Sequence, residues 1–156
     1  MLFRSHARGA QIVGVCGGYQ MLGELILDPT QADSELESGV GLGLLPVETT
    51  MASEKTTRTV QATTPSGISF AAYEIHMGVS ASPCPPFALI NGRPEGARQG
   101  SVVGTYLHGA LEDHRVLSEL LGRPVQPMPS KDEAYDGLAR WFAANANLKL
   151  FEEQFL

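Results

Sequence analysis

The stretch that decides the fold is Ile12-Val13-Gly14-Val15-Cys16-Gly17-Gly18, close to the start of the 156-residue chain. Its first four residues, together with the preceding Gln11, predict a strand over Gln11–Val15 that is buried on both faces, of the kind found in parallel sheets. The glycine-x-cysteine-x-glycine pattern has the form of a nucleophile elbow, in which a strand turns sharply into a helix with the reactive side chain at the tip. The stretch therefore predicts an α/β fold with Cys16 at a strand-to-helix turn.

The glycines around Cys16 make such a turn possible. The backbone at the tip is strained, and we expect a Cβ at Gly14 or Gly18 to collide with the adjoining strand. At a helix N-terminus the dipole favours a thiolate, and the backbone N–H of Gly17 is expected to face a developing oxyanion. The alternative from this pattern alone is that Cys16 is a small buried apolar residue at a tight connection.

The rest of the chain alternates between helical and strand-like patterns. Apolar spacing predicts one short helix over Tyr19–Leu27, and helical stripes over residues 131–156 with a break at Asn145 and Asn147. Five segments have the alternation or β-branched content of strands: residues 47–50, 56–64, 68–75, 87–90 and 101–108. The last of these delivers His108 at its end.

The composition of the chain argues against several kinds of partner and cofactor. The chain has 17 Asp plus Glu, 11 Lys plus Arg and a formal net charge of -6, with no basic cluster that could follow a phosphate backbone, so we expect no nucleic acid partner. No apolar run could cross a bilayer and the N-terminus has no signal-peptide pattern, so we expect no membrane association and a cytoplasmic location. Cys16 and Cys84 lack metal-ligand spacing, and we expect no metal and no cofactor.

Four motifs in register resemble the C-terminal glutamine amidotransferase domain of the cobyric acid synthase family. They are VGVCGGYQMLG at 13–23, GLGLLPVET at 41–49, YEIHMG at 73–78 and GTYLHG at 104–109. The segment at 133–139 is similar to the family's terminal helix, so the resemblance covers nearly the whole chain. It implies a class I, flavodoxin-like amidotransferase sandwich with an antiparallel β extension, and a single domain over residues 1–156.

The resemblance also implies the chemistry. Cys16 is expected to attack the side-chain amide of glutamine, with His108 as the base, and the ammonia passes to an ATP-dependent synthetase. In the family that synthetase amidates a cobyrinic acid a,c-diamide corrinoid in cobalamin (vitamin B12) biosynthesis. The positions implied for oxyanion and substrate binding are Gly17, Gly18, Tyr19, Gln20, Glu74 and His76.

One position departs from the wider class. Many class I amidotransferases carry a glutamate two residues after the base, and here that position is Ala110. The group that orients His108 therefore stays open between Glu112, Asp113, Glu74 and a backbone carbonyl, or the site is a simple dyad. Strand alternation places Glu74 on the same face as His76, where the pair is expected to line the cleft near Cys16.

Parts of the family pattern are missing. Family members carry earlier strands, a loop that donates a second oxyanion N–H, and an ATP-binding domain with a P-loop, but this sequence has no Gly-x-x-x-x-Gly-Lys-Ser/Thr stretch. We therefore expect a domain truncated at its N-terminal side, with an exposed sheet edge for which homodimerisation is one hypothesis. Two alternatives remain: a non-catalytic fragment, and an amidotransferase serving another acceptor, as in cobyrinate a,c-diamide synthase or cell-wall lipid amidation.

Overall fold

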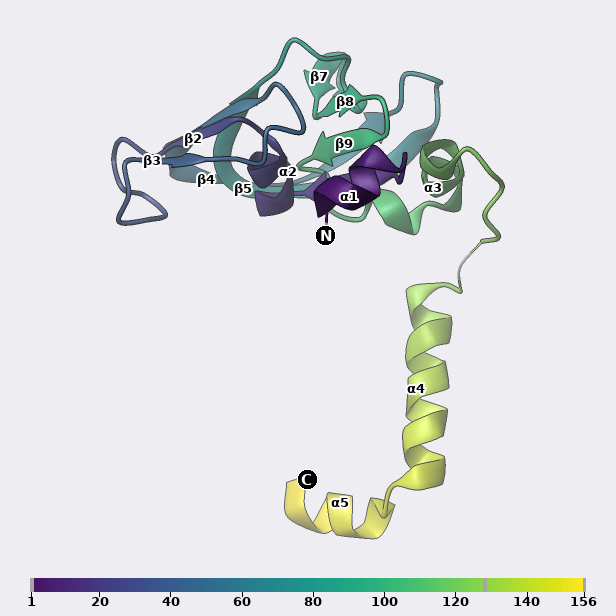
Figure 1. The fold of residues 1–156 in the computed structure, drawn as a ribbon. Helices are drawn as coiled ribbons and strands as arrows, with labels where there is room; N and C mark the ends of the chain where they lie inside the picture. The colour runs from purple at the N-terminus through teal and green to yellow at the C-terminus, as the bar shows by residue number, and fades with distance from the viewer. Residues whose placement is uncertain (1, 128, 156) are drawn as a thin grey trace. The chain divides into compact units, whose positions relative to one another are not determined.

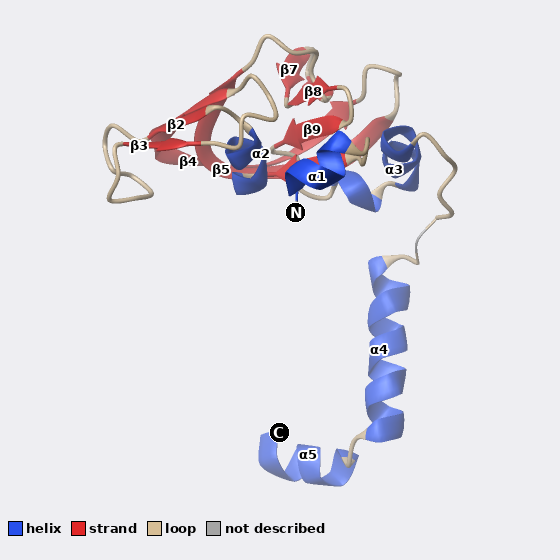
Figure 2. Cartoon of the chain, viewed as in Figure 1, coloured by secondary structure: helices blue, strands red, loops and turns tan. Residues whose placement is uncertain are grey.

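The computed structural model describes residues 2–127 and 129–155. The chain divides into two compact units, Met1–Val125 and Gln126–Leu156, and each is described by itself. Figure 1 follows the chain from its N-terminus to its C-terminus. Figure 2 shows that the strands of the described residues lie in the first unit, whereas the second unit is helical.

A three-stranded sheet in the first unit is built around strand β9 (Val102–Thr105). This strand lies between β1 (Ile12–Val15) and β8 (Ala97–Gln99). It pairs in parallel with β1, in a register that places Val15 beside Thr105, and antiparallel with β8. The buried parallel-type strand predicted before Cys16 is therefore confirmed, and its partner comes from the far end of the unit.

The remaining strands form a six-stranded, mostly antiparallel sheet. Its largest part is the hairpin of β4 (Glu48–Thr63) and β5 (Ser69–Ala81), which turns at the predicted Pro65-Ser66-Gly67 segment. Strand β4 joins two predicted strands across an irregularity between Met51 and Thr56. The other members are β2 (Leu25–Leu27), β3 (Ser38–Val40), β6 (Ala88–Ile90) and β7 (Arg93–Glu95). Among the described strands of this sheet, only β2 and β4 pair in parallel.

The segment after Cys16 corrects one prediction. The sequence predicts a single helix over Tyr19–Leu27, whereas helix α2 covers only Gly17–Leu22 and β2 begins at Leu25. Gly23 between them is extended, with φ -69° and ψ -174°, and a Cβ there would lie 2.5 Å from the carbonyl oxygen of Val47. The apolar residues of β2 fit helical spacing, but pairing with β3 and β4 on its two sides decides their conformation.

Strand β9 separates two hydrophobic clusters. All four of its residues are buried, and Val103 belongs to one cluster whereas Val102 belongs to the other, as alternation in a strand requires. The first cluster comprises Val60, Ala62, Phe70, Ala72, Phe87, Ala88, Ile90, Val103, Leu107, Ala110, Val116 and Leu120. The second comprises Ile12, Tyr19, Leu22, Leu45, Val47, Ala97, Val102 and Tyr106. The remaining helices of this unit are α1 (Leu2–Ala7), the 3-10 turn η1 (Ala110–Glu112) and α3 (His114–Leu121).

The observed fold confirms the general part of the predicted fold class. A mixed α/β architecture with a long antiparallel hairpin is confirmed. The described strands make one parallel pair in each of two sheets, and by themselves they do not form one doubly wound parallel sheet. The flavodoxin-like sandwich therefore stays a prediction.

The second unit consists of α4 (Lys131–Asn145) and α5 (Leu148–Phe155). Ser130 caps α4 in a capping box with Glu133, and the predicted break at Asn145 and Asn147 is confirmed. The two helices contact each other through the rings of Phe142 and Phe151, whose centroids are 5.3 Å apart. Within the described part of the chain, no helix combines the length and the apolar character that crossing a bilayer requires.

Candidate active site

Cys16 occupies the tip of the turn between β1 and α2. Its φ of 55° and ψ of -118° lie in a region that non-glycine residues rarely adopt. The carbonyl oxygen of Cys16 accepts hydrogen bonds from the backbone N–H groups of Tyr19 and Gln20, at 2.9 and 3.2 Å, so the strained residue directly opens the helix. The strained bend predicted from the sequence is confirmed.

The two flanking glycines contribute unequally to this bend. A Cβ on Gly14 would lie 2.6 Å from both the carbonyl oxygen of Gly18 and the Cδ1 atom of Leu22, so no larger residue fits there. A Cβ on Gly18 would have no atom within 4 Å. The prediction that both positions exclude a side chain is therefore wrong for Gly18, because its side-chain direction faces open space while its carbonyl faces Gly14.

Two further contacts fix Cys16 against the sheets. Its backbone N–H donates to the carbonyl oxygen of Thr105 at 2.9 Å, which continues the pairing of β1 with β9. Its Sγ atom lies 3.4 Å from the carbonyl oxygen of Ile75 in β5 and donates a hydrogen bond to it. The thiol is half-buried, so it is held in place and still reachable by a small molecule.

His108 is held by the same strand, β5. Its backbone N–H donates to the carbonyl oxygen of Tyr73 at 2.9 Å, and the N–H of Tyr73 donates back at 3.1 Å. The two rings stack with centroids 4.9 Å apart and planes 12° apart. The Nε2 atom of His108 is buried and makes no hydrogen bond to any described residue. The imidazole therefore has a fixed ring plane and a nitrogen available for proton transfer.

The structure brings Cys16 and His108 to neighbouring places. Cys16 contacts Ile75, and His108 pairs with Tyr73. Ile75 and Tyr73 are two residues apart in β5. They also connect through Thr105, which accepts from Cys16 and precedes His108 by three residues. Two residues far apart in the sequence are thus positioned by the same pair of strands.

Two of the acidic candidates for orienting His108, Glu74 and Asp113, have other partners. Glu74 forms an ion pair with Arg58. Asp113 caps α3 through the N–H of Arg115 and also binds the Arg115 side chain, whose hydrogen bonds lower the pKa of this carboxyl to about 2. Ala110, where the wider class carries glutamate, is buried in the first hydrophobic cluster.

Glu74 and His76 lie together, as strand alternation predicted. His76 Nε2 is 3.5 Å from a carboxylate oxygen of Glu74, and His76 Nδ1 is 2.7 Å from the carbonyl oxygen of Gly78. Since a carbonyl oxygen only accepts, Nδ1 carries the hydrogen and donates it. The ring of His76 also stacks on Tyr106, with centroids 3.9 Å apart.

A pocket of about 420 Å³ opens beside this pair. Five of its polar and aromatic lining residues are Tyr19, Glu74, His76, Glu95 and Tyr106. Tyr19 belongs to helix α2, which begins directly after Cys16. Burial raises the pKa of Tyr106, against the lowering effect of its hydrogen bonds to Ser80 and Gln20. Glu74 and His76 therefore line a pocket whose wall adjoins the elbow.

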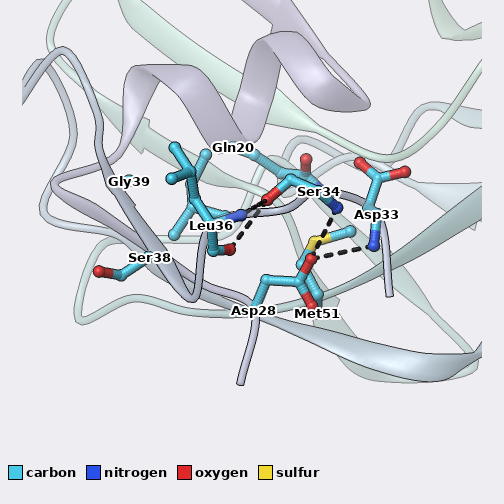
Figure 3. Close-up of a pocket in the computed structure, with 9 residues that line it drawn as sticks. Gln20, Asp28, Asp33, Ser34, Leu36, Ser38, Gly39 and Met51 are labelled. Atoms are coloured by element: carbon cyan, nitrogen blue, oxygen red, sulfur yellow. Dashed lines mark hydrogen bonds between the residues drawn. The ribbon is translucent and has the colours of Figure 1, made fainter. Parts of the chain in front are cut away.

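Gln20 links the elbow to two pockets. Its Nε2 atom donates to the hydroxyl oxygen of Tyr106 at 3.3 Å. It also lines a smaller pocket of about 210 Å³, shown in Figure 3 with Met51 and the loop that begins at Asp28. The buried carboxylate of Asp28 accepts from the backbone N–H groups of three loop residues at 2.7 to 3.0 Å, which lowers its pKa. The loop wall of this pocket is therefore ordered by one acidic side chain.

Glu95 is a buried acid that the sequence patterns did not single out. It is 8% exposed, and its two carboxylate oxygens accept from the Thr105 hydroxyl at 2.7 Å and from the Tyr106 backbone N–H at 2.6 Å. Burial raises its pKa to about 7, against the lowering effect of these two hydrogen bonds. The only signal in the sequence was a charged residue beside the turn glycine Gly96.

The remaining predicted positions have plainer surroundings. Tyr19 is buried in the second cluster with its ring against Gly104, and burial raises its pKa. Gly17 is exposed, at the first position of α2. Cys84 Sγ lies 3.7 Å from a side-chain oxygen of Gln99, in the proline-rich loop. Among the described residues, no cluster of His, Cys, Asp and Glu has a geometry that could hold a metal ion.

Comparison with known families adds to this geometry. Residues 1–116 match a family model described as the CobB/CobQ-like glutamine amidotransferase domain. The matched range contains Cys16, His108 and all nine strands of the described structure.

Curated relatives that match the chain are cobyric acid synthases. One from Limosilactobacillus reuteri is 35% identical over 97% of this chain and 35% of the relative. One from a Jannaschia species is 47% identical over 70% of this chain and 24% of the relative. One from Cereibacter sphaeroides is 48% identical over 84% of this chain and 28% of the relative. The chain thus spans about a quarter to a third of the length of these relatives.

A solved structure has a similar fold. A crystal structure described as a glutamine amidotransferase aligns with a TM-score of 0.53 and 20% identity, over 78% of this chain and 66% of that one. At this level of identity the likeness concerns the fold alone.

Proposed function

Because the chain belongs to the CobB/CobQ-like glutamine amidotransferase domain family, we propose that it hydrolyses the side-chain amide of glutamine and supplies ammonia to an ATP-dependent synthetase. The observation that carries the proposal is that Cys16, at a strained elbow, and His108 contact positions two residues apart in β5. A cysteine at such a turn with a nearby imidazole is the arrangement that nucleophilic acyl transfer needs.

The reaction follows from these two side chains. His108 takes the thiol proton, and the sulfur of Cys16 attacks the amide carbon of glutamine to form a tetrahedral intermediate. His108 then returns the proton to the leaving nitrogen, so that ammonia departs and a γ-glutamyl thioester remains. Water attacks the thioester with His108 as base, which releases glutamate and restores the thiol. The net reaction converts glutamine and water into glutamate and ammonia.

The substrate lies across the elbow in this proposal. The backbone N–H groups of Gly17 and Gly18, in the first turn of α2, stabilise the oxyanion, because the first N–H groups of a helix have no acceptor within it. Gln20, Glu74 and His76 line the adjoining pockets and hold the polar end of glutamine, while buried Tyr19 supports the pocket wall.

The acceptor is proposed from the relatives. All three relatives described above are cobyric acid synthases, so the ammonia serves the amidation of a cobyrinic acid a,c-diamide corrinoid in cobalamin biosynthesis. The sequence contains no P-loop stretch, and the synthetase reaction therefore belongs to a partner domain or subunit. The match that covers 97% of the chain supports treating residues 1–156 as one amidotransferase domain.

The test is a glutaminase assay. The chain is incubated with glutamine, alone and with a separately expressed synthetase domain of a cobyric acid synthase, and glutamate and ammonia are measured. We expect equimolar products in at least one condition, and a loss of at least about 10³-fold in Cys16→Ser and in His108→Gln, as for a nucleophile and base that act as a unit.

His6→Gln is the matched control for His108→Gln, because it also removes an imidazole but at an exposed position outside the site. Its activity should stay within about twofold of the unsubstituted chain, as expected for a substitution outside the site. Equal rates in the chain and in Cys16→Ser, in both conditions, contradict the proposal and favour a non-catalytic fragment.

A further inference from the structure

The segment between Thr105 and His108 connects the two halves of the proposed site. At one end, Thr105 accepts the hydrogen bond from the Cys16 backbone. At the other end, His108 pairs with Tyr73 in β5. Strand β9 ends at Thr105, so the two residues in between, Tyr106 and Leu107, lack strand partners for their N–H groups among the described sheets.

Those two N–H groups are satisfied by side chains. The N–H of Tyr106 donates to Glu95 Oε1 at 2.6 Å, and the N–H of Leu107 donates to Thr105 Oγ1 at 3.0 Å. The Thr105 hydroxyl in turn donates to Glu95 Oε2 at 2.7 Å. One carboxyl group thus holds the whole segment, directly at Tyr106 and through Thr105 at Leu107.

The fold brings Glu95 to this segment by a close backbone contact. Glu95 ends β7, and Gly96 follows with φ +70° before β8 begins. A Cβ on Gly96 would overlap the carbonyl oxygen of Gly104 in β9, so only glycine lets the β7–β8 turn approach this closely. Glu95 itself is buried, which protects its hydrogen bonds from competition with water.

We propose that Glu95 is a positioning residue for His108: its carboxyl group fixes the path of Tyr106 and Leu107 and thereby the place of the imidazole relative to Cys16. The inference rests on the proposed glutaminase function. It also gives the proposed site an acidic group that acts through the backbone, whereas Glu74 and Asp113 are engaged by Arg58 and Arg115.

Hydrogen bonding, and not negative charge, carries this role. Burial raises the pKa of Glu95 to about 7, so a large share of the protein has the neutral acid near pH 7. The neutral acid still accepts from the Tyr106 N–H through its carbonyl oxygen, and its hydroxyl donates to Thr105, which has a second lone pair for the Leu107 N–H. A glutamine at this position can make the same two bonds, whereas a methionine of similar size can make neither.

The test compares Glu95→Met with Glu95→Gln in the glutaminase assay. Misplacing a reacting group by about 1 Å lowers rates by on the order of 10²-fold, so we expect kcat to fall about 10- to 100-fold in Glu95→Met with KM within about twofold. Glu95→Gln should retain kcat within about threefold, because the two hydrogen bonds remain. Circular dichroism and thermal unfolding establish that both variants are folded.

Thr105→Val is a second variant that tests the proposal if Glu95→Met does not fold. This substitution removes only the hydroxyl that connects Glu95 to Leu107, and we expect an intermediate loss of kcat with unchanged KM. In a Glu95→Met, Thr105→Val double variant the losses should not add, since both act on one network. A kcat within threefold of the unsubstituted chain in folded Glu95→Met, or in Thr105→Val where Glu95→Met is unfolded, overturns the proposal. A Glu95→Gln as impaired as Glu95→Met also overturns it.

A spectroscopic arm separates this inference from the proposed function. The imidazole signals of His108 are assigned by comparison with His108→Gln in two-dimensional NMR, with the exposed His6 as internal reference. We expect the His108 signals to shift in Glu95→Met and to stay in place in Glu95→Gln. If the chain has no glutaminase activity, the proposed function fails and these shifts alone decide the positioning role. Unchanged His108 signals in Glu95→Met overturn it.

Discussion

Cys16 shows how a single residue is held in a strained backbone conformation. Its φ of 55° places a side chain where glycine is usually required, and a strained residue of this kind persists only where its surroundings determine it. Here the determinants are Thr105, which accepts from its N–H, and Gly14, which leaves room for the turn. The strain therefore depends on β9 as much as on the elbow itself.

Glu95 predicts an unusual dependence of stability on pH. Its pKa is about 7 in the folded protein and 4.5 in the ordinary case, so between these values the folded state holds a proton that the unfolded state has released. The free energy of unfolding should therefore fall as pH rises from 4.5 to 7, by at most about 3 kcal/mol for a shift of this size. Below pH 4.5 Glu95 is protonated in both the folded and the unfolded state, so none of this stability is lost.

The measurement is urea unfolding of the chain and of Glu95→Gln at pH 5 and pH 8. Other titrating groups cancel in the difference between the two proteins, so Glu95→Gln should gain relative stability at pH 8. An equal difference at the two pH values would show that Glu95 does not titrate in this range.

At the residue scale the sequence points to the proposed reactive residues more directly than to the supporting ones. Cys16 and His108 lie in short motifs that resemble those of the family, and the bend at Cys16 follows from the glycine before it. Glu95 lies in no such motif, and the motif that contains Tyr73 does not reveal its contact with His108. Their roles come from contacts with Tyr106 and His108 that only the folded chain creates.

At the scale of elements, β9 packs closely against α2 because Gly104 in β9 has no side chain. A Cβ on Gly104 in β9 would overlap the ring of Tyr19 in α2, which is 2% exposed and has no room to move. Gly104→Ala should therefore destabilise the protein by about 1–3 kcal/mol, as overpacking in a core does. The check is the urea midpoint at constant slope.

Gly39→Ala is the matched control for that substitution. Gly39 also lies in a strand, β3, but a Cβ there meets no atom within 4 Å. We expect a change within about 0.5 kcal/mol, as for exposed substitutions away from special features. If both variants were equally destabilised, the loss of glycine itself, and not the contact with Tyr19, would be responsible.

The elements also show where sequence patterns are sufficient. The β4–β5 hairpin has local turn chemistry at Pro65-Ser66-Gly67, and the helix break near Asn145 has local polar residues, so both could be predicted. The segment Leu25–Leu27 could not, because its strand conformation depends on pairing with β3 and β4, which lie further along the chain. Apolar spacing over so few residues does not distinguish helix from strand.

At the scale of the whole molecule, the buried core belongs to the first unit. Every buried apolar residue in the described part of the chain lies between Ile12 and Leu120. A variant that ends at Val125 should therefore unfold cooperatively, with a Tm within about 4 °C of the full chain, since 1 kcal/mol shifts the Tm of a domain of this size by a few degrees. Differential scanning calorimetry measures both quantities.

A shorter variant that ends at Gly109 provides the control. It removes Val116 and Leu120, which are 1% and 4% exposed in the first cluster. We expect this variant to lose cooperative unfolding, because the cluster is left open to water. Cooperative unfolding of the shorter variant, or its loss in the longer one, would show that the core has been assigned to the wrong part of the chain.

The pairing of β1 with β9 has a consequence for how the chain acquires its chemistry during synthesis. The hairpin of β4 and β5 is local and closes early, whereas Ile12 meets Val102 only after nearly the whole first unit has left the ribosome. Until then Cys16 has no Thr105 to hold its backbone, and His108 is not yet in place on β5. Under the proposed function, a nascent chain therefore carries an ordinary cysteine, and its activation as a nucleophile waits until the first unit completes its folding.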